Sequence, residues 1–422
     1  MTTVPDAVAS QQRQLLERAQ FVYRATPLSA ATCAAFLAVP RHGFVRRYRV
    51  WGSTAWQEVT PDTLAHHLAR LYNDEALVLA GDDDENLLST ISQPSFMLRM
   101  LDLLQLAPGQ RVFELGAGSG WNAALIAQLV GPTGRVVSLE LHPDIARDAQ
   151  AALQAHGITT AKVVTGDGGE GYAPGAPYDR VIFTAGSYEV PRAFFTQLAD
   201  GGRLLLVLKQ AGGGDYLCLL RRTGDHFVSE LLDSCAFLAL RGKYQHPELE
   251  PQALEECPPY AALRDQECDR TPFWWGGANP RELLWRTLGI RFFLSITEPG
   301  YRVFTAKVSA GQDHTRPIFG IADEAAHSLV LAHDDQLITY GTPRARAQLL
   351  QRLHEWVDLG MPSAASFTVH VYPRDHAVKP RAQEWLVVRE ESQFLWTLHR
   401  HTAAAMDGTS HGLPRPQTER HT

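Results

Sequence analysis

The chain has 422 residues, of which 45% are hydrophobic and 20% are charged, and its formal net charge at pH 7 is −7. This length and composition are typical of a globular protein with two or three domains. The negative balance gives no overall basic field for nucleic acid or for an anionic membrane, so we expect neither as a partner.

Five cysteines are scattered through the chain without the CxxC or CxxH spacing of a metal site. An odd and dispersed set is typical of reduced thiols and not of a disulfide framework. The first twenty residues lack the basic start and the apolar core of a secretory signal. No apolar run reaches the roughly eighteen residues that are needed to span a bilayer. The sequence therefore predicts a soluble, cytoplasmic protein.

The N-terminal part of the chain is predicted to be mainly helical. Apolar residues recur at steps of three and four over residues 11–23 and 29–37, and Ser29 is placed to cap the second helix. An extended loop, Val39–Val45, should follow, because a residue that precedes proline avoids the helical region. A further helix is expected over residues 61–71.

A run of acidic residues, Gly81–Glu85, comes next. It is either a solvated turn or an acidic rim that would select a basic or neutral stretch of a peptide. The sequence Thr90-Ile91-Ser92-Gln93-Pro94 follows it and precedes a helix predicted over residues 94–104. Ser92 could cap that helix, and Pro94 suits its first turn.

A strand, a glycine turn and a helix start lie together at the centre of the pattern. Arg111–Leu115 reads as a buried strand, Gly116–Gly120 as the turn, and Trp121–Val130 as a helix. Glycine permits positive φ and close approach, and the first N–H groups of a helix are free to bind a polar cofactor. The spacing is GxGxG and not the GxGxxG of dinucleotide-binding folds.

Three more strands follow, each ending in polar or small residues. Arg135–Leu139 ends in Glu140, twenty residues beyond Gly120, and an acid at that position can accept both ribose hydroxyls of an adenosine. Ala161–Thr165 ends in Gly166-Asp167-Gly168, which suits an adenine edge. The fourth strand, Tyr178–Gly186, ends in small residues that leave room for a ligand.

This pattern is typical of the α/β fold of class I (Rossmann-like) methyltransferases that use S-adenosylmethionine. We therefore expect S-adenosylmethionine to contact residues at the carboxyl ends of these strands, namely Glu114, Gly116, Ala117, Gly118, Ser119, Gly120, Glu140, Leu141, Gly166, Asp167, Gly168 and Thr184. No metal ion is expected in the site.

The rest of the methyltransferase core is predicted from helical and strand periods. Helices are expected over residues 143–156 and 189–198, and strands over residues 203–208, 216–222 and 227–240. Residues 243–259 are rich in proline and glutamate, lack an apolar period and read as a linker.

The remaining residues predict a second α+β domain with its own core. Strands are expected over 292–297, 302–308, 317–322, 328–331, 337–340, 367–372, 385–388 and 394–398, with an amphipathic helix over 343–359. The aromatic residues Phe273, Trp274 and Trp275 could hold a substrate peptide or be buried. The scattered histidines of this domain, such as His314, lack metal-ligand spacing.

The predicted organisation has five consecutive parts. They are an N-terminal helical segment (1–80), a methyltransferase core (81–242), a linker (243–259), a C-terminal α+β domain for substrate recognition (260–401) and a disordered tail (402–422).

Several motifs together resemble one methyltransferase family. Val39-Pro-Arg-His-Gly-Phe-Val, Thr90-Ile-Ser-Gln-Pro, the glycine turn, Gly166-Asp-Gly and Glu189-Val-Pro occur in that order. Together they are similar to protein-L-isoaspartate (D-aspartate) O-methyltransferases over roughly residues 15–242. Residues 46–72 depart from that family as an insertion before Tyr72-Asn73-Asp74.

The resemblance implies roles for individual residues. It places Ser92 between the methyl donor and the acceptor carboxylate as the active-site residue. It also implies substrate contacts for Thr90, Ile91, Gln93, Arg41 and His42, although His42 could equally be a structural loop residue. A carboxylate is already a nucleophile at pH 7, so positioning and exclusion of water are the main contributions asked of the protein.

The C-terminal extension implies a narrower substrate range than general repair. Extended chains of this kind resemble methyltransferases of bacterial ribosomal peptide pathways (lanthipeptide, lasso-peptide and graspetide). There, methylation of an aspartate or isoaspartate carboxylate gives an ester that can cyclise to aspartimide. We therefore predict carboxyl methylation of a peptide, and whether Asp or isoAsp is the acceptor stays open.

Two alternatives remain. One is general protein-L-isoaspartate repair, in which the extension is an accessory. The other is a peptide-binding protein with a degenerate methyltransferase fold, and the intact residues Glu114, Gly116, Glu140 and Asp167 argue against it. The sequence gives no indication of the oligomeric state.

Overall fold

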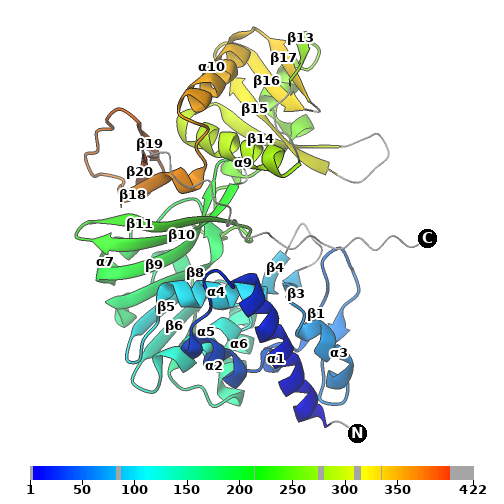
Figure 1. Ribbon diagram of the computed structural model, residues 1–422, viewed down its shortest axis with the longest axis vertical. Helices are drawn as coiled ribbons and strands as arrows, with labels where there is room; N and C mark the ends of the chain where they lie inside the picture. Colours follow the sequence, from blue (N-terminus) through cyan, green and yellow to red (C-terminus); the bar gives the residue numbers. More distant parts are fainter. Residues whose placement is uncertain are drawn as a thin grey trace. The chain divides into compact units, whose positions relative to one another are not determined.

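The computed structural model of the chain describes residues 3–81, 87–212, 214–273, 280–307, 315–333 and 335–399. These residues divide into two compact units, one that ends at Gly166 and one that begins at Asp167 (Figure 1). The predicted boundaries at residues 242 and 259 stay a prediction. The acidic residues 82–85, Trp274, Trp275, His314 and the tail 402–422 lie outside the described residues.

The first unit begins with helices and short strands. Their bounds are α1 Val4–Val22, α2 Ala30–Ala38, a 3-10 helix η1 Arg41–Phe44, β1 Arg47–Tyr48, β2 Gln57–Glu58, α3 Leu64–Leu71, β3 Leu77–Gly81, β4 Leu87–Ile91 and α4 Pro94–Leu104. Ser29 caps α2 as predicted, because its hydroxyl accepts a hydrogen bond from the backbone N–H of Thr32 at 3.2 Å. The loop Val39–Val45 is not fully extended, since η1 occupies its centre.

Three parallel strands with interleaved helices complete the first unit. They are β5 Arg111–Leu115, α5 Trp121–Val130, β6 Arg135–Glu140, α6 Pro143–Ala155 and β7 Ala161–Thr165. The register pairs Leu115 with Leu139 and Glu140 with Thr165, so all three carboxyl ends meet at one edge. These bounds agree with the prediction within a residue, because glycine or proline lies near most of the boundaries.

The second unit contains two sheets. The first has the order β8-β9-β10-β11-β18-β20-β19, in which β8 and β9 are parallel and the later pairs are antiparallel. Its strands are β8 Tyr178–Ser187, β9 Leu198–Gln210, β10 Gly214–Thr223, β11 His226–Cys235, β18 Phe367–Pro373, β19 Glu384–Val388 and β20 Ser392–Leu398. The C-terminal strands therefore continue the sheet of β8–β11, and Figure 1 shows β18 beside β11.

The second sheet has the order β12-β14-β15-β16-β17-β13. Its elements are β12 Gln252–Ala253, α8 Pro258–Leu263, β13 Glu267–Pro272, β14 Tyr301–Lys307, β15 Thr315–Asp323, β16 Ser328–His333, β17 Gln336–Gly341 and α10 Arg344–Asp358. Helix α10 lies along this sheet and contacts β15 and β16 (Figure 1). The predicted strands of this region and the helix α10 are confirmed.

The predicted strand 292–297 is wrong, because these residues form the second half of helix α9, Pro280–Thr297. Phe292, Phe293, Leu294 and Ile296 are all buried, so the run shows no helical period. When a short segment of a helix is continuously apolar, its sequence pattern alone cannot distinguish it from a buried strand.

Two other elements of the second unit differ from the prediction. The expected helix over 189–198 is reduced to α7, Phe194–Gln197. The residues before α7 make hydrogen bonds outside a helix. Ser187 Oγ donates to the Glu189 carbonyl at 2.7 Å, and the Val190 N–H donates to Ser392 Oγ at 3.0 Å. Strand β11 ends at Cys235 and not at residue 240.

The segment expected as a linker contributes to the second unit's packing. It holds the short elements η4 Pro247–Leu249, β12 and η5 Leu254–Glu256. Leu254 and Cys257 are buried in the core of the six-stranded sheet with Phe304, Leu331 and others. The sparse apolar positions of this segment are therefore core contacts of the adjacent sheet.

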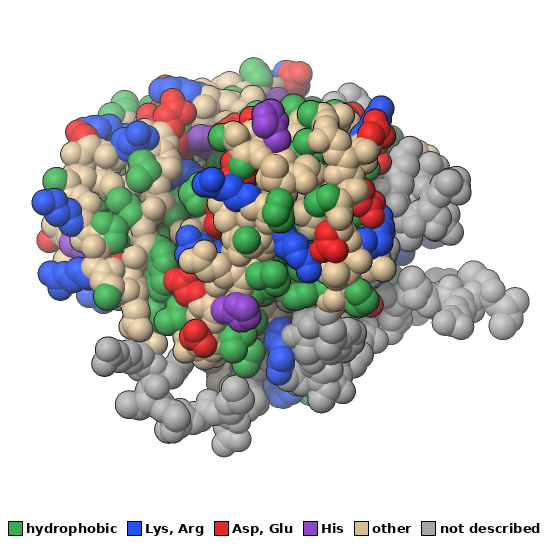
Figure 2. Space-filling view, turned by 90° about the horizontal axis from the view of Figure 1, so that it is seen from above, with side chains coloured by type: hydrophobic (Ala, Val, Ile, Leu, Met, Phe, Trp, Pro, Cys, Tyr) green, Lys and Arg blue, Asp and Glu red, His purple; other side chains and the backbone are tan. Residues whose placement is uncertain are grey.

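Figure 2 shows basic and acidic side chains interspersed on the face that it displays. Among the described residues, no helix combines the length and the apolar character that crossing a bilayer requires.

Candidate active site

The glycine turn after β5 is fastened to the end of β6. The backbone N–H groups of Gly116 and Ala117 donate to the Leu139 carbonyl at 2.8 and 3.1 Å. Gly116, Gly118 and Gly120 have φ values of +91°, +51° and +82°. Such values favour glycine because a Cβ atom would be strained there. The turn thus presents backbone to a ligand in a fixed shape.

Glu140 is buried at the end of β6, and its carboxylate holds the same turn. Oε2 accepts a hydrogen bond from the Gly118 N–H at 3.0 Å, and Oε1 accepts one from the His142 N–H at 3.2 Å. Each carboxylate oxygen can accept more than one bond, so these contacts leave capacity for ribose hydroxyls. Leu141, the next residue in the chain, is half-buried. Gly166 is also half-buried, and its N–H donates to the Glu140 carbonyl at 2.9 Å.

Glu114 is bonded to other residues of the protein. It is completely buried, and its carboxylate accepts hydrogen bonds from Asn122 Nδ2 at 2.7 Å and from the Ser138 hydroxyl. Burial raises the pKa of Glu114 to about 7, against the opposing effect of these hydrogen bonds, and nearby Glu140 raises it further. We therefore assign it to fixing α5 and β6 under the turn.

The Thr90–Gln93 motif lies against the glycine turn. A Cβ atom built on Gly118 would be 3.4 Å from Ser89 Oγ and 3.5 Å from the Thr90 carbonyl oxygen. Strand β4 pairs with β3, and Ser92 follows its last residue as a half-buried side chain. The expected acceptor side and the expected cofactor side are therefore adjacent within one unit.

The hydroxyl of Ser92 makes no hydrogen bond with any residue that the structure describes, whereas the Gln93 side chain is committed. Gln93 Nε2 donates to Asp74 Oδ2 at 3.1 Å, and the other oxygen of Asp74 accepts from the Ser95 N–H at 2.9 Å. Helix α4 thus has Gln93 as its N-cap residue and the Asp74 carboxylate as its capping acceptor. Ser92 is not the cap of α4 and is available for a ligand.

Arg41 is a positioning residue and not an exposed substrate contact. Its guanidinium group is fully buried and donates to the carbonyl oxygens of Leu71 at 2.6 Å, Glu75 at 2.9 Å, Ile91 at 3.3 Å and Ser92 at 3.1 Å. Burial lowers the pKa of Arg41 to about 10, which still leaves it charged at pH 7. It therefore joins α3 to the end of β4.

His42 is half-buried next to Arg41, and its Nδ1 lies 2.8 Å from the Tyr72 hydroxyl. Burial, together with nearby His156, lowers the pKa of His42 and so favours the neutral imidazole. The structural interpretation of His42 fits these contacts. Asp74 and Tyr72 were not predicted as site residues, although the Tyr72-Asn73-Asp74 motif was a signal that could have found them.

In the second unit, Asp167 shapes the turn that should meet adenine. Its Oδ1 accepts from the Gly169 N–H at 2.9 Å, and its Oδ2 accepts from the Lys243 N–H at 2.7 Å. The ring of Tyr244 packs on this turn, since a Cβ atom on Gly169 would overlap it. Gly168 is buried there, and Thr184 is half-buried in β8. The sequence analysis did not single out Lys243 and Tyr244.

A second polar cluster of this unit surrounds His246. Its two ring nitrogens lie 3.0 Å from carboxylate oxygens of Glu189 and Glu248. These carboxylates, Glu189 foremost, raise the pKa of His246. Glu189, His246 and Glu390 could together hold a metal ion, but both ring nitrogens already have carboxylate partners.

The comparisons with known proteins agree with this geometry. The family model described as protein-L-isoaspartate (D-aspartate) O-methyltransferase matches residues 22–245. A protein-L-isoaspartate O-methyltransferase of Ignicoccus hospitalis is 36% identical over 43% of this chain and 81% of its own length. That of Methanopyrus kandleri is 36% identical over 51% of this chain and 85% of its own length.

A solved structure of a protein-L-isoaspartate O-methyltransferase aligns over 85% of this chain and 96% of its own length, with a TM-score of 0.51 and 25% identity. The fold is that of class I methyltransferases, as predicted. The chain belongs to the protein-L-isoaspartate (D-aspartate) O-methyltransferase family. It is accordingly an enzyme that uses S-adenosylmethionine, and it acts on proteins or peptides.

Proposed function

We propose that this enzyme methylates the free carboxylate of isoaspartyl residues in proteins and peptides. The observation that carries the proposal is the close approach of Ser89 and Thr90 to Gly118 of the glycine turn, shortly before Ser92 in the chain. It supports a position of Ser92 near the methyl donor. The residues around the turn fit S-adenosylmethionine, because bare glycine backbone and the Glu140 carboxylate leave room and acceptors for it. When bound, this cofactor supplies an electrophilic methyl group.

The protein's own contribution is to orient the acceptor. A serine hydroxyl can donate to one oxygen of an incoming carboxylate and so direct the other oxygen. Arg41 holds the backbone of Ile91 and Ser92 in place through their carbonyl oxygens. The carboxylate is already ionised at pH 7, so no general base is required.

The comparisons favour the general isoaspartyl activity over the peptide-pathway reading that the sequence ranked first. Their printed names refer to protein-L-isoaspartate O-methyltransferases. The solved structure also aligns over 85% of this chain, well beyond residues 22–245, so a C-terminal extension is not itself a mark of a peptide pathway.

The test is the Ser92→Ala variant with an isoaspartyl peptide and labelled S-adenosylmethionine. We expect methylation to fall by roughly tenfold to a hundredfold, because the lost contact orients the acceptor. Cofactor affinity, measured by calorimetry, should stay within about threefold. Ser234→Ala, at an exposed position of β11, is the control and should behave as the unaltered protein.

If Ser92→Ala strongly weakened cofactor binding but kept its rate at saturating cofactor, the acceptor role of Ser92 would be excluded.

A further inference from the structure

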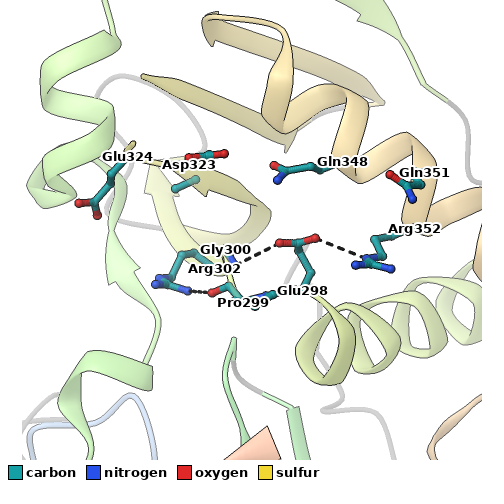
Figure 3. Close-up of a pocket in the computed structure, with 10 residues that line it drawn as sticks. Glu298, Pro299, Gly300, Arg302, Asp323, Glu324, Gln348, Gln351 and Arg352 are labelled. Atoms are coloured by element: carbon teal, nitrogen blue, oxygen red, sulfur yellow. Dashed lines mark hydrogen bonds and ion pairs between the residues drawn. The ribbon is translucent and has the colours of Figure 1, made fainter. Parts of the chain in front are cut away.

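A pocket of about 600 Å³ opens between the end of α9, the start of β14, the end of β15 and helix α10. Its wall includes Glu298, Asp323, Glu324 and Gln348, together with Arg302 and Arg352 (Figure 3). This volume lies within the range of ligand sites. All of these residues belong to the second unit, and none of them took part in the site described above.

Two acceptors of this pocket lack close donors, whereas Asp323 accepts from the Ala326 N–H at 3.1 Å and pairs with Arg344. Gln348 Oε1 is buried without a hydrogen-bond partner. The side chain of Glu298 is only 9% exposed, yet its carboxylate contacts are long: 3.3 Å to the Gly300 N–H and 3.5 Å to Arg352 Nε. Charge-assisted hydrogen bonds are normally about 2.7–2.9 Å. A buried acceptor without a partner costs free energy, so a donor is missing here.

Both arginines of the wall already donate to other groups of the protein. Arg352 Nη1 donates to Glu355 at 2.7 Å. Arg302 Nη1 donates to the carbonyl oxygens of Pro299 and Tyr301, both at 2.8 Å. Figure 3 shows Arg302 turned to the backbone of Pro299, while the Gln348 amide and the Glu298 carboxylate face the same space. The buried wall atom that lacks a partner, Gln348 Oε1, is thus an acceptor, so a ligand that completes this part of the pocket should donate.

The missing ligand should be a cation with several N–H groups. Glu298, Asp323 and Glu324 supply three carboxylates, and Asp323 already pairs with Arg344 at 2.9 Å. An ammonium group concentrates its donors at one point, whereas a guanidinium group presents five N–H donors in a planar fork. Acceptors contributed by separate elements, such as Glu298 after α9 and Gln348 on α10, suit the wider group.

We propose that this pocket binds the guanidinium group of an arginine side chain that the protein substrate presents. That the arginine belongs to a protein substrate rests on the proposed function. Binding of a guanidinium group by the pocket does not depend on it. It gives the C-terminal part of the chain, predicted as a substrate-recognition region, a defined chemical preference for a basic residue.

The binding test uses the full chain and a small probe, Nα-acetyl-arginine N-methylamide, followed by calorimetry or by protein-observed NMR. Saturable binding is expected, with the citrulline analogue at least tenfold weaker because it lacks the charge. Equal binding of the arginine and citrulline probes, or no saturable binding of either, would overturn the proposal.

Three variants locate the probe. Glu324→Gln is exposed and should fold normally, while Glu298→Gln and Gln348→Leu remove the buried acceptors. Each should weaken probe binding several-fold, and the two buried changes by about tenfold. Asp358 is an exposed carboxylate at the end of α10, the helix of Gln348, and lies outside the pocket. Asp358→Asn is therefore the matched control and should not change binding. Uniform binding across all four would overturn the pocket as the site.

The activity test separates this inference from the proposed function. Isoaspartyl peptides that differ only by arginine or citrulline should show a severalfold difference in KM and similar kcat values. If neither peptide is methylated but the probe binds, the proposed function fails and the pocket stands. If both are methylated with one KM while the probe does not bind, the pocket fails alone.

Discussion

The carboxylates of the glycine-turn region of the first unit are bonded more closely than the acceptors Glu298 and Gln348 of the α9–β14–α10 pocket of the second unit. Around the turn, Glu140, Glu114 and Arg41 all bond to other parts of the protein. In the pocket, Gln348 Oε1 has no partner, and Glu298 has only long contacts. Engaged groups fix a shape in advance, whereas an unpartnered acceptor in the wall of a pocket can be completed by a ligand. Substitutions in the two regions should therefore have different consequences.

The largest effect is expected from Arg41→Ala. It removes a buried cation and leaves four carbonyl oxygens without their donor. We expect the free energy of unfolding to fall by about 3–5 kcal/mol, as for other broken buried charge networks. Denaturant titration measures this change.

Arg46→Ala is the matched control for Arg41. Arg46 is 70% exposed and pairs with Asp148 only at 3.7 Å. Its loss should change the free energy of unfolding by less than about 0.5 kcal/mol. Equal effects of the two substitutions would show that Arg41 does not hold β4 in place.

The pH dependence of Glu114 should be next in size. Its pKa of about 7 in the folded protein exceeds the ordinary value of 4.5. The folded state therefore holds a proton that the unfolded chain releases, and stability falls as pH rises from 4.5 to about 7. The total change is on the order of 3 kcal/mol. Glu114→Gln should flatten this part of the stability–pH curve. An unchanged slope in denaturant titrations of the variant would refute the buried protonation.

A smaller effect is expected from Glu140→Ala. It removes the acceptor of the Gly118 N–H and the expected partner of the ribose hydroxyls. An unpaired buried group costs about 1–3 kcal/mol, so S-adenosylmethionine should bind roughly tenfold or more weakly. Glu140→Gln retains one carbonyl acceptor and should lose less. Calorimetry with unchanged affinity in both variants would remove Glu140 from the cofactor site.

The smallest effect is expected from Glu324→Gln in the pocket. This side chain is exposed, and its substitution should leave the melting temperature and the cofactor affinity unchanged. A clear loss of melting temperature would show that the pocket's acids, like the residues of the glycine turn, serve stability.

The same contrast explains what the sequence predicts well. Strands β5 and β6 and helix α5 follow from local signals, because glycine and short-range periodicity set their boundaries. The residues Gly116, Gly118, Gly120 and Glu140 lie where the motif predicts. The adjacency of Ser92's motif to this turn follows from the resemblance and not from local pattern.

Other features depend on contacts between distant residues. The four carbonyl partners of Arg41 lie thirty or more positions away in the chain, so its positioning role could not be predicted from Val39–Val45 alone. The bond from the Gln93 amide nitrogen to Asp74 could not be predicted from the local motif, and the substrate contact of Gln93 stays a prediction. Helix α9 was predicted partly as a strand because burial on all sides removes its helical period.

The most direct test of the central claim compares two peptides that differ only in one linkage. The full chain is incubated with S-adenosylmethionine and an isoaspartyl peptide or its normal aspartyl counterpart. The aspartyl sequence is also tested within a preformed macrocycle. The products are analysed by mass spectrometry. We predict one added methyl group on the isoaspartyl peptide and none on the aspartyl peptides. Methylation of the macrocyclic aspartyl peptide, with the isoaspartyl peptide left unmodified, would contradict the proposed function.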